Sequence, residues 1–239
     1  MYNAAQPMVR SAVITGGSKG IGLAIAEAFA AAGVSVTIAG RDEAALAAAR
    51  DALGSRGVDV LASRTDVRDY AAVEKMMAEA ARTFGGIDVL VNNAGVGAFA
   101  PVDEMSIEDW HKVIDTNLNA VFYCTKAALP YLRKSPNAYV INISSLAGKN
   151  WFAGGAAYCA SKAGVNAFSE ALMQDVRQHD IRVTYVMPGS VNTAFSFMGA
   201  KPADWKLTGA DIAKVVLDLV RSDKRALASR VEIRPSKPR

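Results

Sequence analysis

The sequence predicts a doubly wound α/β domain, with a parallel sheet of about seven strands and helices on both faces. Two observations predict this fold. Short apolar runs alternate with longer Ala-rich or amphipathic segments along the whole chain. A glycine-rich turn at residues 16–22 joins the first apolar run to the first helical segment. Hydrophobic residues make up 51% of the 239 residues, enough for a sizeable core, and we expect residues 1–239 to form a single domain.

The first βαβ unit is predicted between residues 11 and 39. Residues 11–15 form an apolar run that ends at a glycine, which is typical of a buried strand. Residues 23–32 form an Ala-rich helix that ends at Gly33, and residues 34–39 form the second strand. The crossover should be right-handed and the two strands parallel.

The alternation then continues to the end of the chain. Further strands are expected at residues 58–62, 88–91, 138–143, 181–186 and 231–233. Further helices are expected at residues 42–56, 69–84, 106–132, 156–179 and 208–221. Capping-box patterns, Ser106-x-x-Asp109 and Thr208-x-x-Asp211, mark two helix starts. A sheet of this kind binds ligands beyond the carboxyl ends of its strands.

Composition and charge exclude several classes of function. The net charge is only +4 and the basic residues are scattered, which favours a small anionic ligand over nucleic acid. No apolar run reaches the ~18 residues that a membrane span needs. Residues 1–10 lack the apolar region of a signal peptide. Cys124 and Cys159 have no metal-binding spacing, so we expect two buried thiols and no metal. Taken together, these observations predict a soluble protein of the cytoplasm.

The glycine-rich turn is a candidate phosphate site. Gly16, Gly20 and Gly22 follow a strand and open a helix in the pattern Gly-x-x-x-Gly-x-Gly. Glycines let backbone N–H groups approach a pyrophosphate, and the helix N-terminus adds partial positive charge. The alternative is a glycine-rich turn that binds no ligand.

The end of the second strand favours NADP(H) over NAD(H). An NAD site usually has an Asp or Glu there to bind the ribose 2′-hydroxyl. Gly40 supplies no carboxylate, whereas Arg41 can form paired hydrogen bonds with a 2′-phosphate, and Lys19 can add a second charge. Asp42 is the competing carboxylate, but it stands where a helix N-cap belongs.

Tyr158 and Lys162 are four residues apart on the predicted helix 156–179, so they share one helical face. Lowering a tyrosine pKa from about 10 to about 7 takes roughly 4 kcal/mol. An ammonium at about 4–5 Å supplies roughly that in an effective dielectric of about 20. The pair could therefore work as a proton donor near neutral pH. Taken alone, such a pair on a helix is more often a half-buried tyrosine beside a solvated lysine, and the other motifs of the chain reverse this balance.

These features, in this order, resemble the short-chain dehydrogenase/reductase family over residues 11–220, in particular NADP(H)-preferring members such as bacterial 3-oxoacyl-acyl-carrier-protein reductases. Seven family motifs occur in sequence order. They are the turn at residues 15–22, Asp66-Val67, the run at residues 92–95, Asn117, Ser144-Ser145, Tyr158-x-x-x-Lys162, and Pro188-Gly189 with Thr193.

The resemblance implies an oxidoreductase with four catalytic residues. Tyr158 would exchange a proton with the carbonyl or alcohol oxygen, and Ser145 would hydrogen-bond the same oxygen. Ser145 is chosen over Ser144 because the family serine lies thirteen residues before its tyrosine. Lys162 would lower the tyrosine pKa and hold the nicotinamide ribose, and Asn117 would maintain a water-linked proton path to Lys162.

The resemblance also implies a set of residues that contact NADP(H). Asp66 and Val67 would bracket the adenine, and residues 93–95 would line the ribose. The full set is Gly16, Ser18, Lys19, Gly20, Ile21, Gly22, Arg41, Asp66, Val67, Asn93, Ala94, Gly95, Tyr158, Lys162, Pro188, Gly189, Val191 and Thr193.

The substrate should contact loops that vary within the family, at residues 97–101, 149–152 and 194–207. The last loop is aromatic and is predicted to be a lid. We expect an apolar or aromatic carbonyl or alcohol, contacted by Ser145, Trp151, Tyr158 and Phe195.

Two alternative functions remain open. One is a 3-oxoacyl-acyl-carrier-protein reductase, in which Arg133 and Lys134 could meet the acidic carrier, although the tail lacks the Gly-Gly pair of that subgroup. The other is a non-catalytic NADP(H) sensor, which the retained Tyr, Lys and Ser disfavour. By resemblance, we expect a homodimer or homotetramer that pairs through the helices at residues 106–132 and 156–179.

Overall fold

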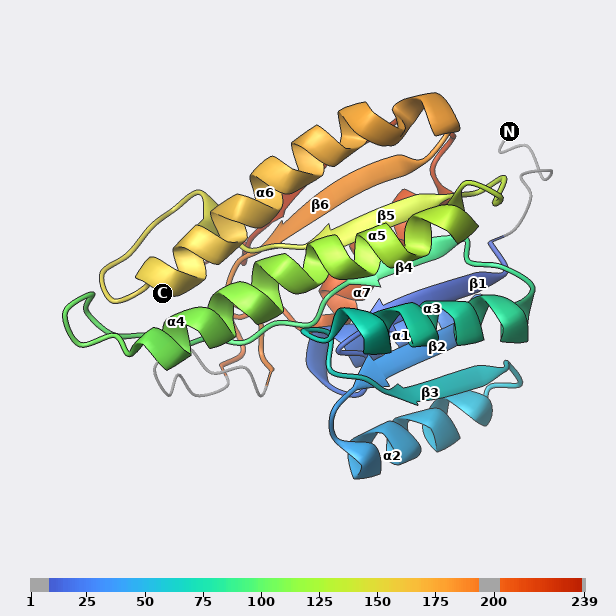
Figure 1. Cartoon of the computed structure of the whole chain (residues 1–239), viewed down its shortest axis with the longest axis horizontal. Helices are drawn as coiled ribbons and strands as arrows, with labels where there is room; N and C mark the ends of the chain where they lie inside the picture. Colours follow the sequence, from blue (N-terminus) through green and yellow to red (C-terminus); the bar gives the residue numbers. More distant parts are fainter. Residues whose placement is uncertain (1–8, 194–202, 238–239) are drawn as a thin grey trace.

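The computed structural model describes residues 9–193 and 203–237, in which seven parallel strands form one sheet. The strand order is β3-β2-β1-β4-β5-β6-β7, so the predicted doubly wound fold is confirmed (Figure 1). The strands are β1 (Ser11–Thr15), β2 (Ser35–Gly40), β3 (Val60–Arg64), β4 (Val89–Asn92), β5 (Tyr139–Ile143), β6 (Arg182–Pro188) and β7 (Arg230–Ile233).

Helices cover both faces of the sheet because strand residues alternate between two apolar cores. In β1, Ala12 and Ile14 pack toward one face and Val13 toward the other. The first core is completed by α1 (Gly20–Ala31), α2 (Glu43–Gly54) and α7 (Gly209–Arg221). The second is completed by α3 (Tyr70–Phe84), α5 (Ala120–Leu132) and α6 (Ala156–Val176). In Figure 1, α3 and α5 cross in front of the strands and α7 lies behind them.

The helix predicted at residues 106–132 contains a π-helical turn. It consists of α4 (Ile107–Ile114), the π turn Asp115–Asn119 and α5. Asn117 lies in this turn, and its side-chain amide hydrogen-bonds both the N–H and the carbonyl of Val96. An extra residue in one helical turn is common at functional sites, and here it directs a buried amide toward the loop after β4.

Several local predictions are confirmed by side-chain hydrogen bonds. Thr208 and Asp211 form a complete capping box at the start of α7. Ser106 accepts a hydrogen bond from the Asp109 N–H, which caps α4. Asp42 caps α2 by accepting a hydrogen bond from the Ala45 N–H at 3.0 Å. Helix α1 begins at Gly20, three residues earlier than predicted, because the last part of the glycine-rich turn is already helical.

Because all seven strands are parallel, the segments that follow them gather at the carboxyl edge of the sheet. A short 3₁₀ turn, Leu146–Gly148, follows β5 there, and Arg177–His179 forms a second one at the end of α6. Across the two described segments, no helix is both long and apolar enough to cross a membrane.

Candidate active site

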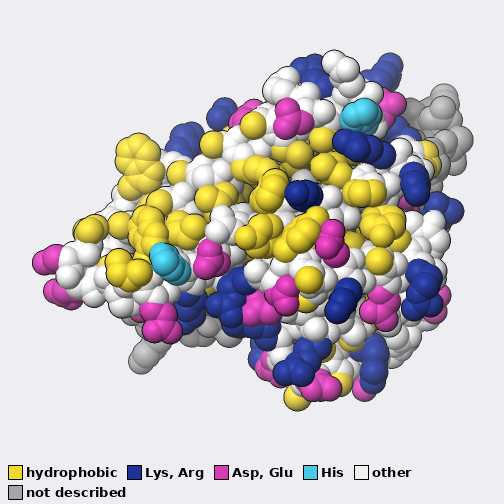
Figure 2. Space-filling view, viewed as in Figure 1, with side chains coloured by type: hydrophobic (Ala, Val, Ile, Leu, Met, Phe, Trp, Pro, Cys, Tyr) yellow, Lys and Arg dark blue, Asp and Glu magenta, His cyan; other side chains and the backbone are white. Residues whose placement is uncertain are grey.

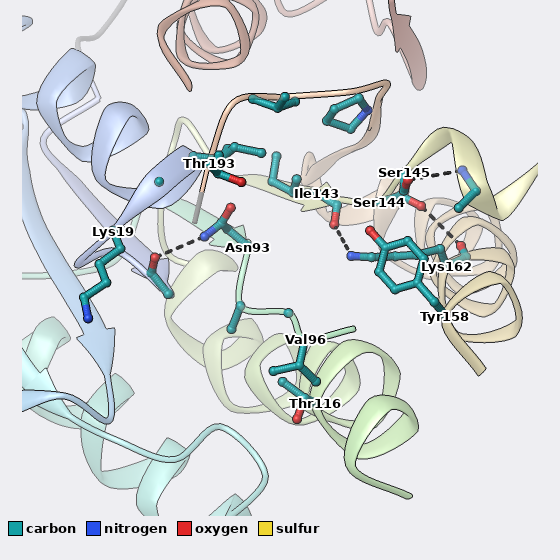
Figure 3. Close-up of a pocket in the computed structure, with 18 of the residues that line it drawn as sticks. Lys19, Asn93, Val96, Thr116, Ile143, Ser144, Ser145, Tyr158, Lys162 and Thr193 are labelled. Carbon is teal, nitrogen blue, oxygen red and sulfur yellow. Dashed lines mark hydrogen bonds between the residues drawn. The ribbon is translucent and has the colours of Figure 1, made fainter. Parts of the chain in front are cut away.

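A cavity of about 1170 Å³ lies at this carboxyl edge, lined by residues that follow each of the seven strands. Its volume exceeds the roughly 300–1,000 Å³ of ordinary small-ligand pockets, which leaves room for a dinucleotide and a second molecule. Figure 3 shows Lys19 on one side of the cavity and Tyr158 with Lys162 on the other, with Asn93 and Thr193 between them. Nowhere in residues 9–193 and 203–237 do three His, Cys, Asp or Glu side chains gather as a metal site.

The glycine-rich turn has the geometry of a phosphate cradle. Gly16 and Gly20 have φ values of 64° and 57°, which favour glycine. A Cβ atom on Gly22 would lie 2.2 Å from the Gly16 carbonyl oxygen. The first turn of α1 carries no acidic residue and has no side-chain cap, so its N-terminal N–H groups are directed at the cavity without a protein anion beside them. The turn therefore fits the diphosphate of a dinucleotide.

Asn93 braces this turn from the end of β4. Its side-chain amide donates to the carbonyls of Thr15 at 2.9 Å and Gly16 at 3.2 Å. The Thr15 hydroxyl accepts from the N–H groups of Asn93 and Ala94, both at 3.0 Å. Thr15 was not among the predicted site residues. A hydroxyl residue at the end of a buried strand, directly before the glycine-rich turn, is the signal that would have found it.

Basic and acidic side chains alternate near the end of β2. Lys19 and Asp42 form an ion pair at 2.6 Å, and this hydrogen bond is the main cause that holds the pKa of Asp42 below its usual value. Asp66 is paired with Arg68 at 2.7 Å, which lowers the pKa of Asp66. Arg41 lines the cavity between these pairs. Each of these two carboxylates is thus paired with a cation, which reduces its repulsion of an anionic ligand.

Tyr158 and Ser145 meet at the opposite end. Burial raises the pKa of Tyr158 above that of a free tyrosine, and a hydrogen bond with the Ser145 side chain opposes the shift. The Ser145 hydroxyl lies in the cavity and also accepts from the Ala147 N–H at 3.1 Å. Ser144 instead donates to the Lys162 carbonyl and to Asn166, which ties it to α6. Of the two serines, Ser145 is the one hydrogen-bonded to Tyr158.

Lys162 lies beneath the tyrosine, with Nζ 5.8 Å from the centroid of the Tyr158 ring. Nζ donates to the Ile143 carbonyl at 2.9 Å, and burial lowers the pKa of Lys162 to about 8. The expectation that Lys162 brings the pKa of Tyr158 down is not met in the protein alone. Burial of the phenol dominates, and the ammonium is directed at a backbone carbonyl rather than at the phenol oxygen.

Asn117 reaches the same region from the π turn. Its amide donates to the Val96 carbonyl at 2.9 Å and to the Ser161 hydroxyl at 3.0 Å, while its oxygen accepts from the Val96 N–H at 2.8 Å. A Cβ atom on Gly95 would lie 3.4 Å from the Asn117 oxygen and 3.7 Å from the Lys162 Nζ. The side chains of Asn117 and Lys162 therefore both approach Gly95, although Asn117 does not itself line the cavity.

Most of the other predicted contact residues line the same cavity. These are Ser18, Ile21, Val67, Ala94, Pro188, Gly189, Val191 and Thr193. Gly22 lies behind the turn rather than on the cavity wall. Trp151 is not brought into the cavity, because its side chain is 76% exposed at the surface. Phe195 and most of the predicted lid lie outside the described residues.

The end of the cavity that holds Tyr158 has an aromatic wall. The ring of Phe99 lies edge-on to Tyr158 at 5.6 Å and next to Phe152 at 6.1 Å. Phe152, rather than its neighbour Trp151, faces the cavity because its ring packs against Gly155, where a Cβ atom would lie 2.3 Å away. The pattern of aromatic residues in the sequence could not separate the two neighbours.

The model of the short chain dehydrogenase family matches residues 10–201. The chain belongs to the short-chain dehydrogenase family. An NADP-dependent 3-hydroxy acid dehydrogenase of Salmonella typhi is 41% identical over 196 residues, which cover 81% of this chain and 78% of that protein. The predicted recognition of the family is thereby confirmed, and with it the class of the protein, an oxidoreductase.

Two solved structures of the family share the fold and hold NADP-type cofactors. An alcohol dehydrogenase from Thermococcus sibiricus, complexed with 5-hydroxy-NADP, aligns with a TM-score of 0.89 at 30% identity over 97% of this chain and 99% of that one. A metagenomic short-chain oxidoreductase in complex with NADP aligns with a TM-score of 0.83 at 34% identity, over 96% and 98% of the two chains. The expected cofactor agrees with what these relatives bind.

Proposed function

We propose that this short-chain dehydrogenase is an NADP(H)-dependent oxidoreductase that interconverts a carbonyl and an alcohol, with Tyr158 as the general acid and base. The observation that carries the proposal is the meeting of Tyr158, Ser145 and Lys162 at one end of a cavity whose other end is a glycine-rich turn. NADPH, when bound, supplies the hydride for carbonyl reduction.

Tyr158 is suited to give up a proton as negative charge develops on the substrate oxygen. Its raised pKa keeps the phenol protonated at neutral pH, which is the form that reduction needs. Ser145, hydrogen-bonded to Tyr158, would donate a second hydrogen bond to the same oxygen. Lys162 retains its positive charge at pH 7 because its pKa is about 8. This charge does not lower the pKa of Tyr158 in the protein alone, but with NADP(H) bound it would help to stabilise the phenolate that proton transfer leaves.

Asn117 is proposed as a positioning residue. Its three hydrogen bonds join the loop after β4 to α6, through Val96 on one side and Ser161 on the other. Ser161 in turn donates to the carbonyl of Tyr158 at 2.8 Å. Asn117 thereby fixes the distance between the cofactor loop at Gly95 and the helix that carries Tyr158 and Lys162.

The cofactor end would hold NADP(H) by charge and backbone geometry. The turn at residues 16–22 would receive the diphosphate, and Arg41 with Lys19 would bind the 2′-phosphate. The two carboxylates nearby, Asp42 and Asp66, are both paired with cations. The NADP-bound relatives support this assignment.

The aromatic wall of Phe99 and Phe152 supports an apolar or aromatic substrate. Three groups of compounds separate the possible functions in one assay that follows NADPH absorbance. Neutral aryl ketones and 3-oxo acids test the proposal, 3-oxoacyl thioesters on acyl carrier protein test the reductase alternative, and tight NADPH binding with no turnover of any compound would favour a sensor. NADH in place of NADPH tests the cofactor assignment.

The decisive experiment compares Ser145→Ala with its neighbour Ser144→Ala, alongside Tyr158→Phe. We expect Tyr158→Phe and Ser145→Ala to lower kcat by about 10² or more while NADPH still binds. Ser144→Ala removes a hydroxyl that bonds only to α6, so it should affect stability more than turnover. Unchanged kcat in Tyr158→Phe would refute the catalytic assignment.

We also propose that two copies pair through α4, α5 and α6. Figure 2 shows a band of hydrophobic side chains across this face. Phe122, at 47% exposure, packs against Tyr123 and Phe168, and Trp110 is 37% exposed. Sedimentation velocity should show that Phe122→Glu forms a smaller assembly than the unmodified protein does. The matched variant Trp151→Glu, at an exposed aromatic in the loop between β5 and α6, should not change the assembly.

A further inference from the structure

The last strand carries the chain into the wall of the cavity. Strand β7 pairs with β6, and the Gly189 N–H donates to the Ile233 carbonyl at 2.8 Å. The next two residues, Arg234 and Pro235, leave the sheet and line the cavity. Neither was among the predicted site residues, because the tail carries none of the family motifs that point to the site.

Arg234 lies at the substrate end of the cavity rather than at the cofactor phosphates. A Cβ atom on Gly189 would lie 3.1 Å from Pro235 and 3.3 Å from Leu146. Leu146 directly follows Ser145 and lines the same cavity. Pro235 and the residue beside Ser145 therefore meet at one point of the wall, and Arg234 enters the cavity next to that point.

The charges that line this end are positive. In the described part of the chain, the carboxylates that line the cavity are Asp42 and Asp66, both at the β2–β3 end. Arg234 and Lys206 line the wall on the side of β6 and β7. An anion at the substrate end would therefore meet cationic side chains, with no carboxylate among the described lining residues there to repel it.

Glu232 orients Arg234 from outside the cavity. Its carboxylate accepts from an Arg234 terminal nitrogen at 2.9 Å and from Lys149 at 2.7 Å. A guanidinium has five N–H donors in a planar fork, so one bond to Glu232 restrains it and leaves other donors for a ligand. Lys149 bonds to the same carboxylate but does not line the cavity.

We propose that Arg234 binds a carboxylate of the substrate, so that the substrate class is an oxo acid and its hydroxy acid. This rests on the proposed oxidoreductase function of the same cavity. The carboxylate lies against the guanidinium, the apolar part of the substrate contacts Phe99 and Phe152, and the reacting carbon lies near Tyr158. Arg234 selects the substrate and takes no part in the proton or hydride steps.

Binding to the cofactor-loaded protein tests Arg234 without any need for turnover. The probes are 4-phenylbutyrate and its neutral amide, titrated by calorimetry into protein saturated with NADP⁺. For the unmodified protein we expect the carboxylate to bind about tenfold more tightly than the amide, as one hydrogen-bonded charge pair at a half-exposed site allows. In Arg234→Gln this ratio should fall to about one.

Lys149→Gln is the matched control, since it removes the other cation that bonds to Glu232. The ratio should stay about tenfold in this variant. Any of three results would overturn the role of Arg234. The affinity ratio could be near one in the unmodified protein, it could stay tenfold in Arg234→Gln, or it could fall equally in both variants. Unchanged NADPH affinity in Arg234→Gln shows that the variant is folded.

Turnover separates this inference from the proposed function. A 3-oxo-phenylalkanoic acid and its methyl ester are reduced side by side with NADPH. Loss of kcat/KM for the acid alone in Arg234→Gln supports the role of Arg234, and an equal loss for both substrates contradicts it. If the unmodified protein reduces neither compound, nor any other carbonyl, the oxidoreductase function fails, while the carboxylate-to-amide ratio still decides whether Arg234 binds carboxylates.

Discussion

Replacing Lys162 with Met should stabilise the folded protein at neutral pH, although it removes a residue proposed to act in catalysis. Lys162 is only 5% exposed, and burial lowers its pKa from 10.5 to about 8. Below pH 8 the folded protein must carry a buried ammonium, which costs about 3 kcal/mol relative to the unfolded chain. Met has a similar volume and no charge, so it avoids this cost.

The sign of the pH dependence follows from proton binding. Between pH 8 and pH 10.5 the unfolded chain binds more protons at Lys162 than the folded protein does, so stability rises with pH through this window. Above pH 10.5 Lys162 is neutral in both the folded and the unfolded protein, so the cost of burying its charge no longer applies. What remains is the hydrogen bond from Nζ to the Ile143 carbonyl, worth about 1 kcal/mol in favour of Lys.

Lys162→Met should therefore be about 2 kcal/mol more stable than the unmodified protein at pH 7 and about 1 kcal/mol less stable at pH 11. Urea unfolding without cofactor, followed by fluorescence of the three tryptophans, measures both values. Lys134→Met, at an exposed position, is the control. A stability difference that does not change between pH 7 and pH 11, or that changes equally in the control, would refute the buried-charge account.

Three further predictions concern the cofactor end and the π turn. Gly22→Ala should destabilise the fold by about 1–3 kcal/mol and weaken NADPH binding, because the new Cβ would lie 2.2 Å from the Gly16 oxygen. The control is Gly54→Ala, where a new Cβ would meet no atom within 4 Å. This variant should be neutral or stabilising in the same urea assay. Asn117→Ala leaves the Val96 N–H and carbonyl unpaired, so unfolding should become easier by about 3 kcal/mol, and an unchanged urea midpoint would show that Asn117 does not hold the loop. Arg41→Ala and Lys19→Ala should each raise the Kd of NADPH about tenfold at low salt with little change for NADH, measured by nucleotide fluorescence; equal losses for both nucleotides would argue against 2′-phosphate recognition.

Features that depend on local periodicity could be predicted from the sequence. The glycines at 16, 20 and 22 specify the turn because their backbone and steric demands are local. The Thr208–Asp211 capping box and the Asp42 N-cap form within a single turn of chain. Tyr158 and Lys162 share a helical face by their spacing alone. The fold class follows from the alternation of strands and helices, which needs no long-range information.

Features that depend on contacts between distant segments could not be predicted. The role of Asn93 in bracing the turn needs the pairing of β1 with β4. The exchange of Trp151 for Phe152 at the cavity depends on how a loop packs on Gly155. Arg234 reaches the cavity only because β7 adds to the sheet edge beside β6. The pKa of Tyr158 was predicted from one pair of charges, whereas burial of the whole ring decides its direction.

The end of the cavity that holds Tyr158 and Lys162 concentrates features that a stable fold would avoid. Lys162 is a buried cation and Asn117 interrupts a long helix with a π turn. A protein selected for stability alone would replace the lysine with an apolar residue and keep the helix regular. The apolar cores on both faces of the sheet compensate for these local costs. Because Lys162 is proposed to present its charge to the bound ligand, the stability that Lys162→Met gains should coincide with a loss of turnover.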